Sequence, residues 1–137
     1  MKIFICCSKH VYSKVPPIKR DLEYSGHIVT LPNSYDNPGR EQEMRDISDR
    51  VHAEWKGEMI CLQKTKVRDN DGVLVLNYEK NGQPNYIGGA TFLEMYMAWD
   101  EGKKLYLMNP IPANILKDEI EGFSPVIING DLSLIGL

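Results

Sequence analysis

Four short, continuous apolar runs constrain the fold of this chain more than any other sequence feature. They cover residues 3–7, 73–76, 105–108 and 126–128, and polar or turn-forming residues border each one. None alternates apolar with polar residues, so we expect strands that are buried on both faces, as in a parallel sheet covered by helices. A fifth run, residues 27–31, is weaker and predicts a strand nearer an edge.

The segments between these runs have helical patterns. Ser13 is a candidate N-cap for a helix that reaches about residue 25, where Gly26 provides a stop signal. Residues 41–68 place apolar side chains at steps of three and four, which predicts one amphipathic helix in which Gly57 would allow a bend.

A third helix is predicted for residues 89–101, with Gly102 as its end. Strands that alternate with helices in this way indicate an α/β fold. We therefore expect one domain over residues 1–137, with a doubly wound, Rossmann-like (flavodoxin-like) parallel sheet of about five strands.

Composition excludes several classes of protein. The chain has 137 residues and a formal net charge of -3, so it offers no basic footprint for duplex nucleic acid. Its three cysteines are an odd number without a secretory signal, which is typical of reduced thiols in the cytoplasm. The apolar residues 3–7 are too few for a signal peptide or a membrane span. We expect a cytoplasmic protein that does not interact with a membrane.

Metal and cofactor motifs are missing from the sequence. His10, His27 and His52 lie in unrelated contexts, and no HxxxH or CxxC spacing is present. Cys6 and Cys7 are adjacent in an expected strand and so point to opposite faces. The chain also lacks GxGxxG, GxxxxGK[ST] and GxSxG. We therefore expect neither a metal ion nor a bound cofactor.

Polar residues follow the expected strands at the edge where open parallel sheets bind ligands. The candidates for substrate binding after the first, third and fourth strands are Ser8, Lys9, His10, Asn77, Tyr78 and Asn109. The first three would suit a phosphate or a sugar hydroxyl, and capping of the next helix is an equally good interpretation. Residues 32–40 are rich in turn formers and could act as a lid, although a surface connection is the more common role of such a loop.

The segment from Tyr86 to Glu94 carries the strongest local signal. Gly88 and Gly89 let a backbone approach a ligand closely, and the following helix presents unpaired N–H groups to an anion. Gly88 and Gly89, together with Tyr86 and Thr91, are therefore candidates for substrate binding.

Glu94 is the candidate catalytic residue. Its neighbours three and four residues away on a helix are mostly small and apolar, so its carboxylate either reaches solvent past them or lines a pocket. Its place in the early turns of the helix favours the ionised form, which a nucleophile needs. A solvated helix glutamate is the ordinary alternative.

Apolar surface beyond the needs of the core is expected on the long helix around Trp55. Methionine and tryptophan in such positions belong most simply to a core or to a subunit interface. The pattern therefore predicts a homodimer.

Four segments together resemble the nucleoside 2-deoxyribosyltransferase and nucleotide N-glycosidase family. They are residues 3–10, a strand with its following loop; 71–77, a strand; 86–94, a glycine loop and a helix with its glutamate; and 102–107, a Gly-Lys pair before a strand. The resemblance implies a nucleoside or nucleoside 5′-monophosphate as substrate, with Glu94 attacking the anomeric carbon while the base leaves. Water or a second base would then complete hydrolysis or transfer. It also implies that Ser8, Lys9 and His10 help to hold a phosphate.

The chain departs from the family pattern at two positions. Gly88 stands where members usually carry aspartate or serine, six residues before the glutamate. Gln63 lies nearest to the position of an aspartate in the helix before the third strand, and Asp69 and Asp71 are in a different register. The full acidic set of the family is therefore not reproduced.

Two hypotheses follow from these residues. The first is an enzyme that cleaves or exchanges the N-glycosidic bond, for which Tyr78, Tyr86 and Asp36 are unranked candidates for the general acid. The second is a module on the same fold that binds or senses nucleotides without catalysis. The preferred base and sugar, and the need for a 5′-phosphate, stay open at this point.

Overall fold

A computed structural model describes all 137 residues and contains one parallel sheet with the strand order β2-β1-β3-β4-β5. The strands are β1 (Lys2–Cys6), β2 (Ile28–Thr30), β3 (Gly72–Val75), β4 (Lys104–Leu107) and β5 (Val126–Ile127). This order is flavodoxin-like and confirms the predicted doubly wound α/β sheet. The weaker apolar run forms the edge strand β2, as predicted.

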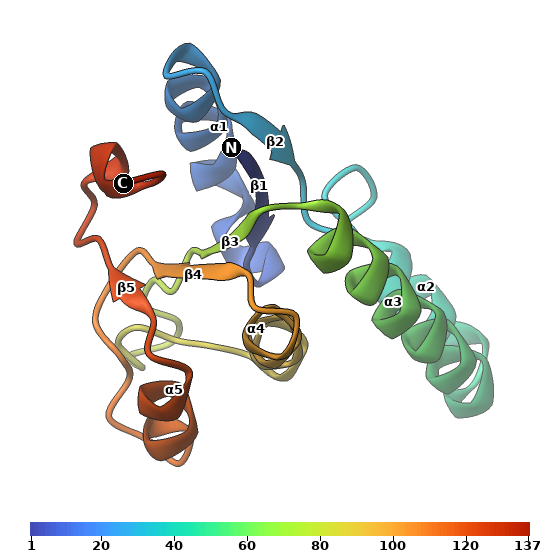
Figure 1. Cartoon of the computed structure of the whole chain (residues 1–137). Helices are drawn as coiled ribbons and strands as arrows, with labels where there is room; N and C mark the ends of the chain where they lie inside the picture. The colour runs from blue at the N-terminus through green and yellow to red at the C-terminus, as the bar shows by residue number, and fades with distance from the viewer.

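Both faces of the sheet are covered by helices (Figure 1). Ile3 and Ile5 of β1 belong to a core shared with α1 (Val15–Tyr24), whereas Phe4 and Cys6 point to the other face. That second core is shared with α3 (Asp49–Asp69), α4 (Gly89–Asp100) and α5 (Lys117–Phe123). Burial on both faces explains why these strands do not alternate apolar with polar residues.

The first helix begins later than predicted. A 3-10 helix, η1 (Lys9–Lys14), contains Ser13 and continues directly into α1, whose N-cap is Lys14. An N-cap side chain needs an extended backbone before the helix, and the continuous helical path leaves none at Ser13. The prediction that Ser13 caps the helix is therefore wrong, while its end at Gly26, with a φ of 92°, agrees with the prediction.

The predicted single helix over residues 41–68 is wrong, because two helices occupy this segment. They are α2 (Arg40–Ile47) and α3, and Ser48 separates them with an extended backbone. The Ser48 hydroxyl accepts a hydrogen bond of 3.1 Å from the Val51 N–H, so this serine caps α3. The helix runs through Gly57 without a break.

The α2–α3 pair extends beyond the edge of the sheet, with α2 packed along the first half of α3 (Figure 1). The third predicted helix is confirmed as α4, and Gly102 follows it with a φ of 66°. After β5 the chain forms only a short 3-10 helix, η2 (Leu132–Leu134). None of the helices combines the length and the apolar character that crossing a membrane requires.

Candidate functional site

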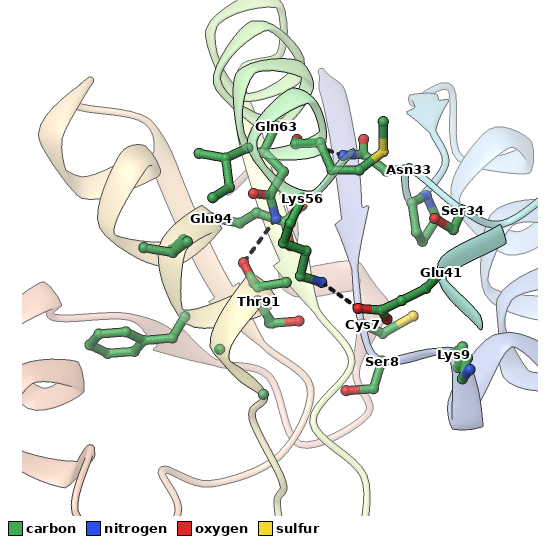
Figure 2. Close-up of a pocket in the computed structure, with 18 of the residues that line it drawn as sticks. Cys7, Ser8, Lys9, Asn33, Ser34, Glu41, Lys56, Gln63, Thr91 and Glu94 are labelled. Carbon is green, nitrogen blue, oxygen red and sulfur yellow. Dashed lines mark hydrogen bonds and ion pairs between the residues drawn. The ribbon is translucent and has the colours of Figure 1, made fainter. Parts of the chain in front are cut away.

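A cavity of about 710 Å³ opens at the carboxyl end of β1, next to the point where the strand order reverses (Figure 2). Its walls come from the end of β1, the loop after β2, one face of α3 and the start of α4. The residues that line it are Cys7, Ser8, Lys9, Tyr12, Pro32, Asn33, Ser34, Pro38, Glu41, Trp55, Lys56, Met59, Ile60, Gln63, Lys80, Gly88, Gly89, Ala90, Thr91, Phe92, Leu93 and Glu94.

Six of the residues predicted from the sequence meet in this cavity. They are Ser8, Lys9, Gly88, Gly89, Thr91 and Glu94. The loop after β2 forms one wall through Pro32, Asn33, Ser34 and Pro38. The sequence had left two roles for this loop, a lid and a surface connection. The strand-end rule therefore brings together residues that are more than 80 positions apart in the sequence.

Asn77 and Asn109 lie outside the cavity and bind each other. The Asn77 amide donates to the carbonyl oxygens of Asn109 at 2.9 Å and Pro110 at 3.1 Å. In return, the backbone N–H and side-chain amide of Asn109 donate to the Asn77 side-chain and backbone oxygens at 2.9 and 3.0 Å. These bonds use the side-chain amide and oxygen of Asn77 to hold two strand ends, so its side chain is not directed to a substrate in the cavity.

His10, Tyr78 and Tyr86 do not line the cavity either. Tyr86 lies between His10, at 5.9 Å between ring centroids, and the Lys80 ammonium, at 4.7 Å from the ring centroid. Lys14 lies over the Tyr78 ring at 4.6 Å. Of these three side chains, only Tyr86 comes near the site, because a Cβ on Gly88 would lie 3.4 Å from the Tyr86 hydroxyl.

Glu94 is the buried carboxyl group of the cavity. It lies in the second turn of α4 and is only 5% exposed. Burial raises its pKa to about 7, although the neighbouring donor groups of Cys6 and Gln63 and the charges of Lys66 and Lys56 act in the opposite direction. The ionised form expected from the helix N-terminus is thus only partly populated at neutral pH, because burial outweighs the helix dipole.

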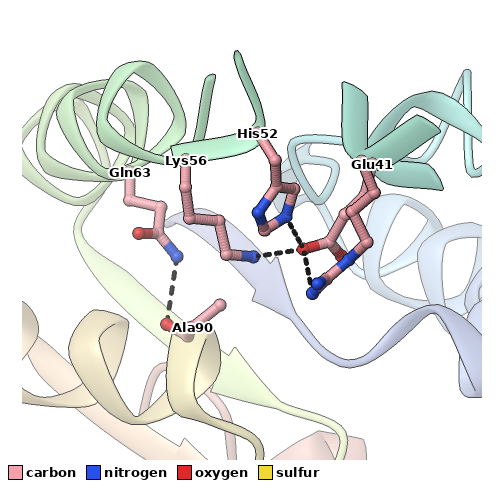
Figure 3. Close-up of polar contacts among 6 residues, drawn as sticks. Glu41, His52, Lys56, Gln63 and Ala90 are labelled. Carbon is pink, nitrogen blue, oxygen red and sulfur yellow. Dashed lines mark hydrogen bonds and ion pairs between the residues drawn. The ribbon is translucent and has the colours of Figure 1, made fainter. Parts of the chain in front are cut away.

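Gln63 of α3 was not predicted as a site residue. It is 4% exposed, and its side-chain nitrogen donates a hydrogen bond of 3.0 Å to the Ala90 carbonyl oxygen in the first turn of α4 (Figure 3). Its side-chain oxygen is buried without any hydrogen-bond partner. A buried acceptor of this kind costs free energy, so it is unusual in a folded protein.

One oxygen of Glu41 in α2 contacts a histidine ring and two cationic side chains (Figure 3). The donors are His52 at 3.0 Å, Lys56 at 3.1 Å and Arg45 at 3.5 Å. Burial alone would raise the Glu41 pKa, but the hydrogen bonds from His52 and Lys56 and the nearby positive charges bring it to about 2. Glu41 therefore compensates the charge that Lys56 brings to the cavity, and ties α2 to α3.

Lys66 lies behind Glu94 and supplies positive charge from outside the cavity wall. Its ammonium donates to the Leu31 carbonyl oxygen at 2.9 Å and lies 5.5 Å from the centre of the Phe4 ring. Burial lowers its pKa, and the charge of Glu94 opposes that change. Asp36, a candidate general acid, acts on Lys66 through its charge but does not line the cavity.

Tyr12 and Cys7 are two further cavity residues that sequence reasoning missed. Burial raises the pKa of the Cys7 thiol to about 12 and raises that of the Tyr12 hydroxyl above its ordinary value, and the Glu94 charge adds to both effects. Both groups are therefore protonated at neutral pH and can donate a hydrogen bond. Their one sequence signal was position: Cys7 precedes Ser8, and Tyr12 follows Lys9 by about one helical turn.

The face of α3 that lines the cavity carries Trp55, Lys56, Met59, Ile60 and Gln63. This spacing of four and three residues is the signal that could have found it. Trp55 is only 8% exposed and so supplies none of the spare apolar surface predicted around it, although Leu62 of the same helix is 38% exposed. The exposed aromatic side chains are Tyr24 of α1 and Tyr96 and Trp99 of α4, and the homodimer stays a prediction.

Side chains of both kinds line the cavity: the lysines are Lys9, Lys56 and Lys80, and the acidic residues are Glu41 and Glu94. No three histidine, cysteine or acidic side chains lie together in a way that could hold a metal ion. No known protein-family model matches the chain, and no curated protein is similar to it. A function for the chain must therefore be inferred from the geometry and charge of the cavity.

Proposed function

We propose that this cavity hydrolyses or transfers the N-glycosidic bond of a nucleoside or nucleoside 5′-monophosphate, with Glu94 as the nucleophile. The observation that carries the proposal is the burial of Glu94 in the cavity wall together with its pKa of about 7. A carboxylate that is poised near neutral pH and shielded from water is suited to a reaction that develops positive charge.

The proposed reaction begins when ionised Glu94 attacks the anomeric carbon of the sugar. The bond from that carbon to the base nitrogen breaks, its electron pair leaves with the base, and a covalent ester to Glu94 forms. Water or a second base then attacks the same carbon and releases the Glu94 carboxylate. The carboxylate also stabilises the oxocarbenium-like transition state through its charge, which has greater effect in a site with little water.

The other end of the cavity suits the sugar 5′ end or its phosphate. Gly88 and Gly89 begin the twelve-residue helix α4, so backbone N–H groups without helical partners face this region. Ser8 supports the same assignment, because its hydroxyl lies 3.4 Å from the place where a Cβ on Gly88 would be. Ser8 thus offers a hydroxyl near the place where the resembled family carries a polar side chain. Lys9 adds a positive charge.

The size and lining of the cavity also support a nucleoside-sized ligand. Its volume of about 710 Å³ lies within the range of roughly 300–1,000 Å³ that is usual for small-molecule sites. Trp55, Met59 and Ile60 provide an apolar wall on α3, which suits the flat face of a base. Tyr12 is a protonated hydroxyl in the wall and is a better placed proton donor for the base than Tyr78.

A module that binds nucleotides without catalysis is the second candidate function. The observation that favours it is Gln63, whose neutral amide lies beside Glu94 where the resembled family carries an aspartate. Such a protein would bind nucleotides through the same cavity and release no base.

Base release distinguishes the two functions. The purified protein is incubated with ribo- and deoxyribonucleosides and their 5′-monophosphates, with and without a second free base, and products are separated by chromatography. We expect release or exchange that disappears in Glu94→Gln. Glu101→Gln, at the exposed end of the same helix, is the matched control and should retain activity. Undiminished release by folded Glu94→Gln would refute Glu94 as nucleophile, and ligand-induced thermal stabilisation without release would support the binding module.

A further inference from the structure

The buried oxygen of the Gln63 side chain has no hydrogen-bond partner although it lies in the wall of the candidate site. The amide cannot be turned around to remove this problem. Its nitrogen faces the Ala90 carbonyl oxygen, which can only accept, so the nitrogen must stay on that side. The oxygen is therefore held in place and needs a donor.

Glu94 is the neighbour that can provide this donor. Ala90 and Glu94 are four residues apart on α4, so they lie on the same face of the helix; Gln63 hydrogen-bonds to the Ala90 carbonyl and influences the Glu94 pKa. An ionised carboxylate can only accept a hydrogen bond from the Gln63 amide N–H, which lowers the Glu94 pKa, and it would leave the Gln63 oxygen facing negative charge. A protonated carboxyl group donates one hydrogen bond and accepts another, which is the complement of a primary amide.

We propose that Gln63 is a positioning residue that pairs with protonated Glu94 at two points: its amide N–H donates to one carboxyl oxygen, and its amide oxygen accepts the carboxyl proton. The second amide hydrogen stays on the Ala90 carbonyl, so every polar group of Gln63 is satisfied. In this arrangement the resting site holds a neutral acid rather than a carboxylate.

The other groups near Glu94 act in both directions. Two thiols and one hydroxyl near Glu94 stay protonated, so they can donate hydrogen bonds but carry no charge. Two ammonium groups also lie near it and favour the carboxylate. These groups are Cys6 of β1, Cys7 after β1, Tyr12 of η1, and Lys56 and Lys66 of α3. Gln63 differs from all of these neighbours because its oxygen is buried without a partner. It is therefore the group that needs a hydrogen bond from the protonated carboxyl group.

The pair has a kinetic consequence, which rests on the proposed function. A nucleophile must lose its proton before it attacks carbon, so the Gln63 pair would keep the site inactive until the carboxyl proton passes to water or to the ligand. Base release would then increase with pH as Glu94 ionises. Removal of the amide oxygen would move that increase to lower pH.

A titration of the Glu94 carboxyl carbon by nuclear magnetic resonance tests the pair without any substrate. Protein with carbon-13 in its glutamate side chains is titrated as wild type and as Gln63→Met, and Glu94→Gln assigns the resonance. Because the pair stabilises the protonated form, we expect the midpoint to fall by about one pH unit in Gln63→Met. A midpoint that rises or stays unchanged would overturn the proposal, because the amide would then act only as a donor to the carboxylate.

A second measurement keeps the test valid if Gln63→Met folds poorly. The infrared difference between wild type and Glu94→Gln at pH 5 isolates the carbonyl band of the protonated carboxyl group. We expect the carbonyl stretching frequency of an acid that donates a strong hydrogen bond. The frequency of an acid without a hydrogen bond would contradict the pair. Gln42→Met, on the exposed face of α2, is the matched control and should leave the midpoint unchanged. Neither readout depends on activity, so failure of the pair and failure of the proposed reaction are separate results.

Discussion

Asn77 and Asn109 exchange three hydrogen bonds that join the carboxyl end of β3 to the carboxyl end of β4. Asn77 is fully buried, and its amide also reaches the Pro110 carbonyl oxygen. The pair takes the place of the sheet hydrogen bonds that would continue if both strands were longer. It therefore stabilises the chain leading to α4 without contacting the cavity.

Replacement of Asn77 by alanine should destabilise the fold. The change leaves two backbone carbonyls and one N–H without their partners in a partly buried place, which costs about 2 kcal/mol of unfolding free energy. Denaturant unfolding measures this loss, and exposed Asn37→Ala is the control that should behave like wild type. Unchanged stability together with lost ligand binding would place Asn77 in the binding site instead.

Glu94 should make the wild-type protein less stable as the pH increases. Its pKa of about 7 in the folded state lies above the 4.5 of an unperturbed glutamate, so the folded state binds the proton more tightly. Stability is therefore complete below about pH 4.5 and declines as the pH rises through 7, by about 3 kcal/mol in total. Glu94→Gln removes this penalty, and its melting temperature should exceed that of wild type at pH 8 but not at pH 4. Equal melting temperatures at both pH values would contradict the burial of a titrating carboxyl group.

Glu41 should have the opposite pH dependence. Its pKa of about 2 lies below the value of 4.5 in the unfolded chain, so its contribution is present above pH 4.5 and is lost as the pH falls through 2. Because the network is partly open to solvent, we expect Glu41→Gln to cost about 1 kcal/mol at pH 7 and progressively less in acid. Hydrogen exchange of α2 and urea unfolding measure this. Glu43→Gln, which removes an exposed pair with Arg40 on the same helix, is the control and should have a smaller effect.

The sheet could be predicted because each strand carries its own local signal. Residues 73–76 are apolar without alternation, and burial on both faces follows from that pattern alone. The division between α2 and α3 could not be found in the same way. Met44, Ile47 and Val51 continue one helical period across it, and the break depends on the Ser48 cap and on the packing of α2 back onto α3.

The site was predictable only where it follows strand ends and a glycine loop. Ser8 and Gly88 meet because β1 and β3 are neighbours in the sheet. Asn77 follows the same rule and still lies outside the cavity, because its side chain is used by the chain after β4. Gln63 and Lys56 were missed for a different reason. Their spacing marks one face of α3, but tertiary packing against α4 decides that this face lines a cavity.

Lys9 should distinguish phosphorylated from unphosphorylated substrates. Its side chain is exposed and lines the same cavity as the Gly88–Gly89 start of α4, where a 5′-phosphate is proposed to bind. A hydrogen bond to a charged group contributes about 1.5–3 kcal/mol, so Lys9→Ala should raise KM for nucleoside 5′-monophosphates by about tenfold or more. KM for the corresponding nucleosides should change little, and kcat should be similar for both because Lys9 is proposed to contact the phosphate and not the reacting carbon. Lys14→Ala, in the same 3-10 helix but over Tyr78 and outside the cavity, is the matched control. Equal increases of KM for both kinds of substrate would mean that Lys9 supports the loop rather than binding phosphate.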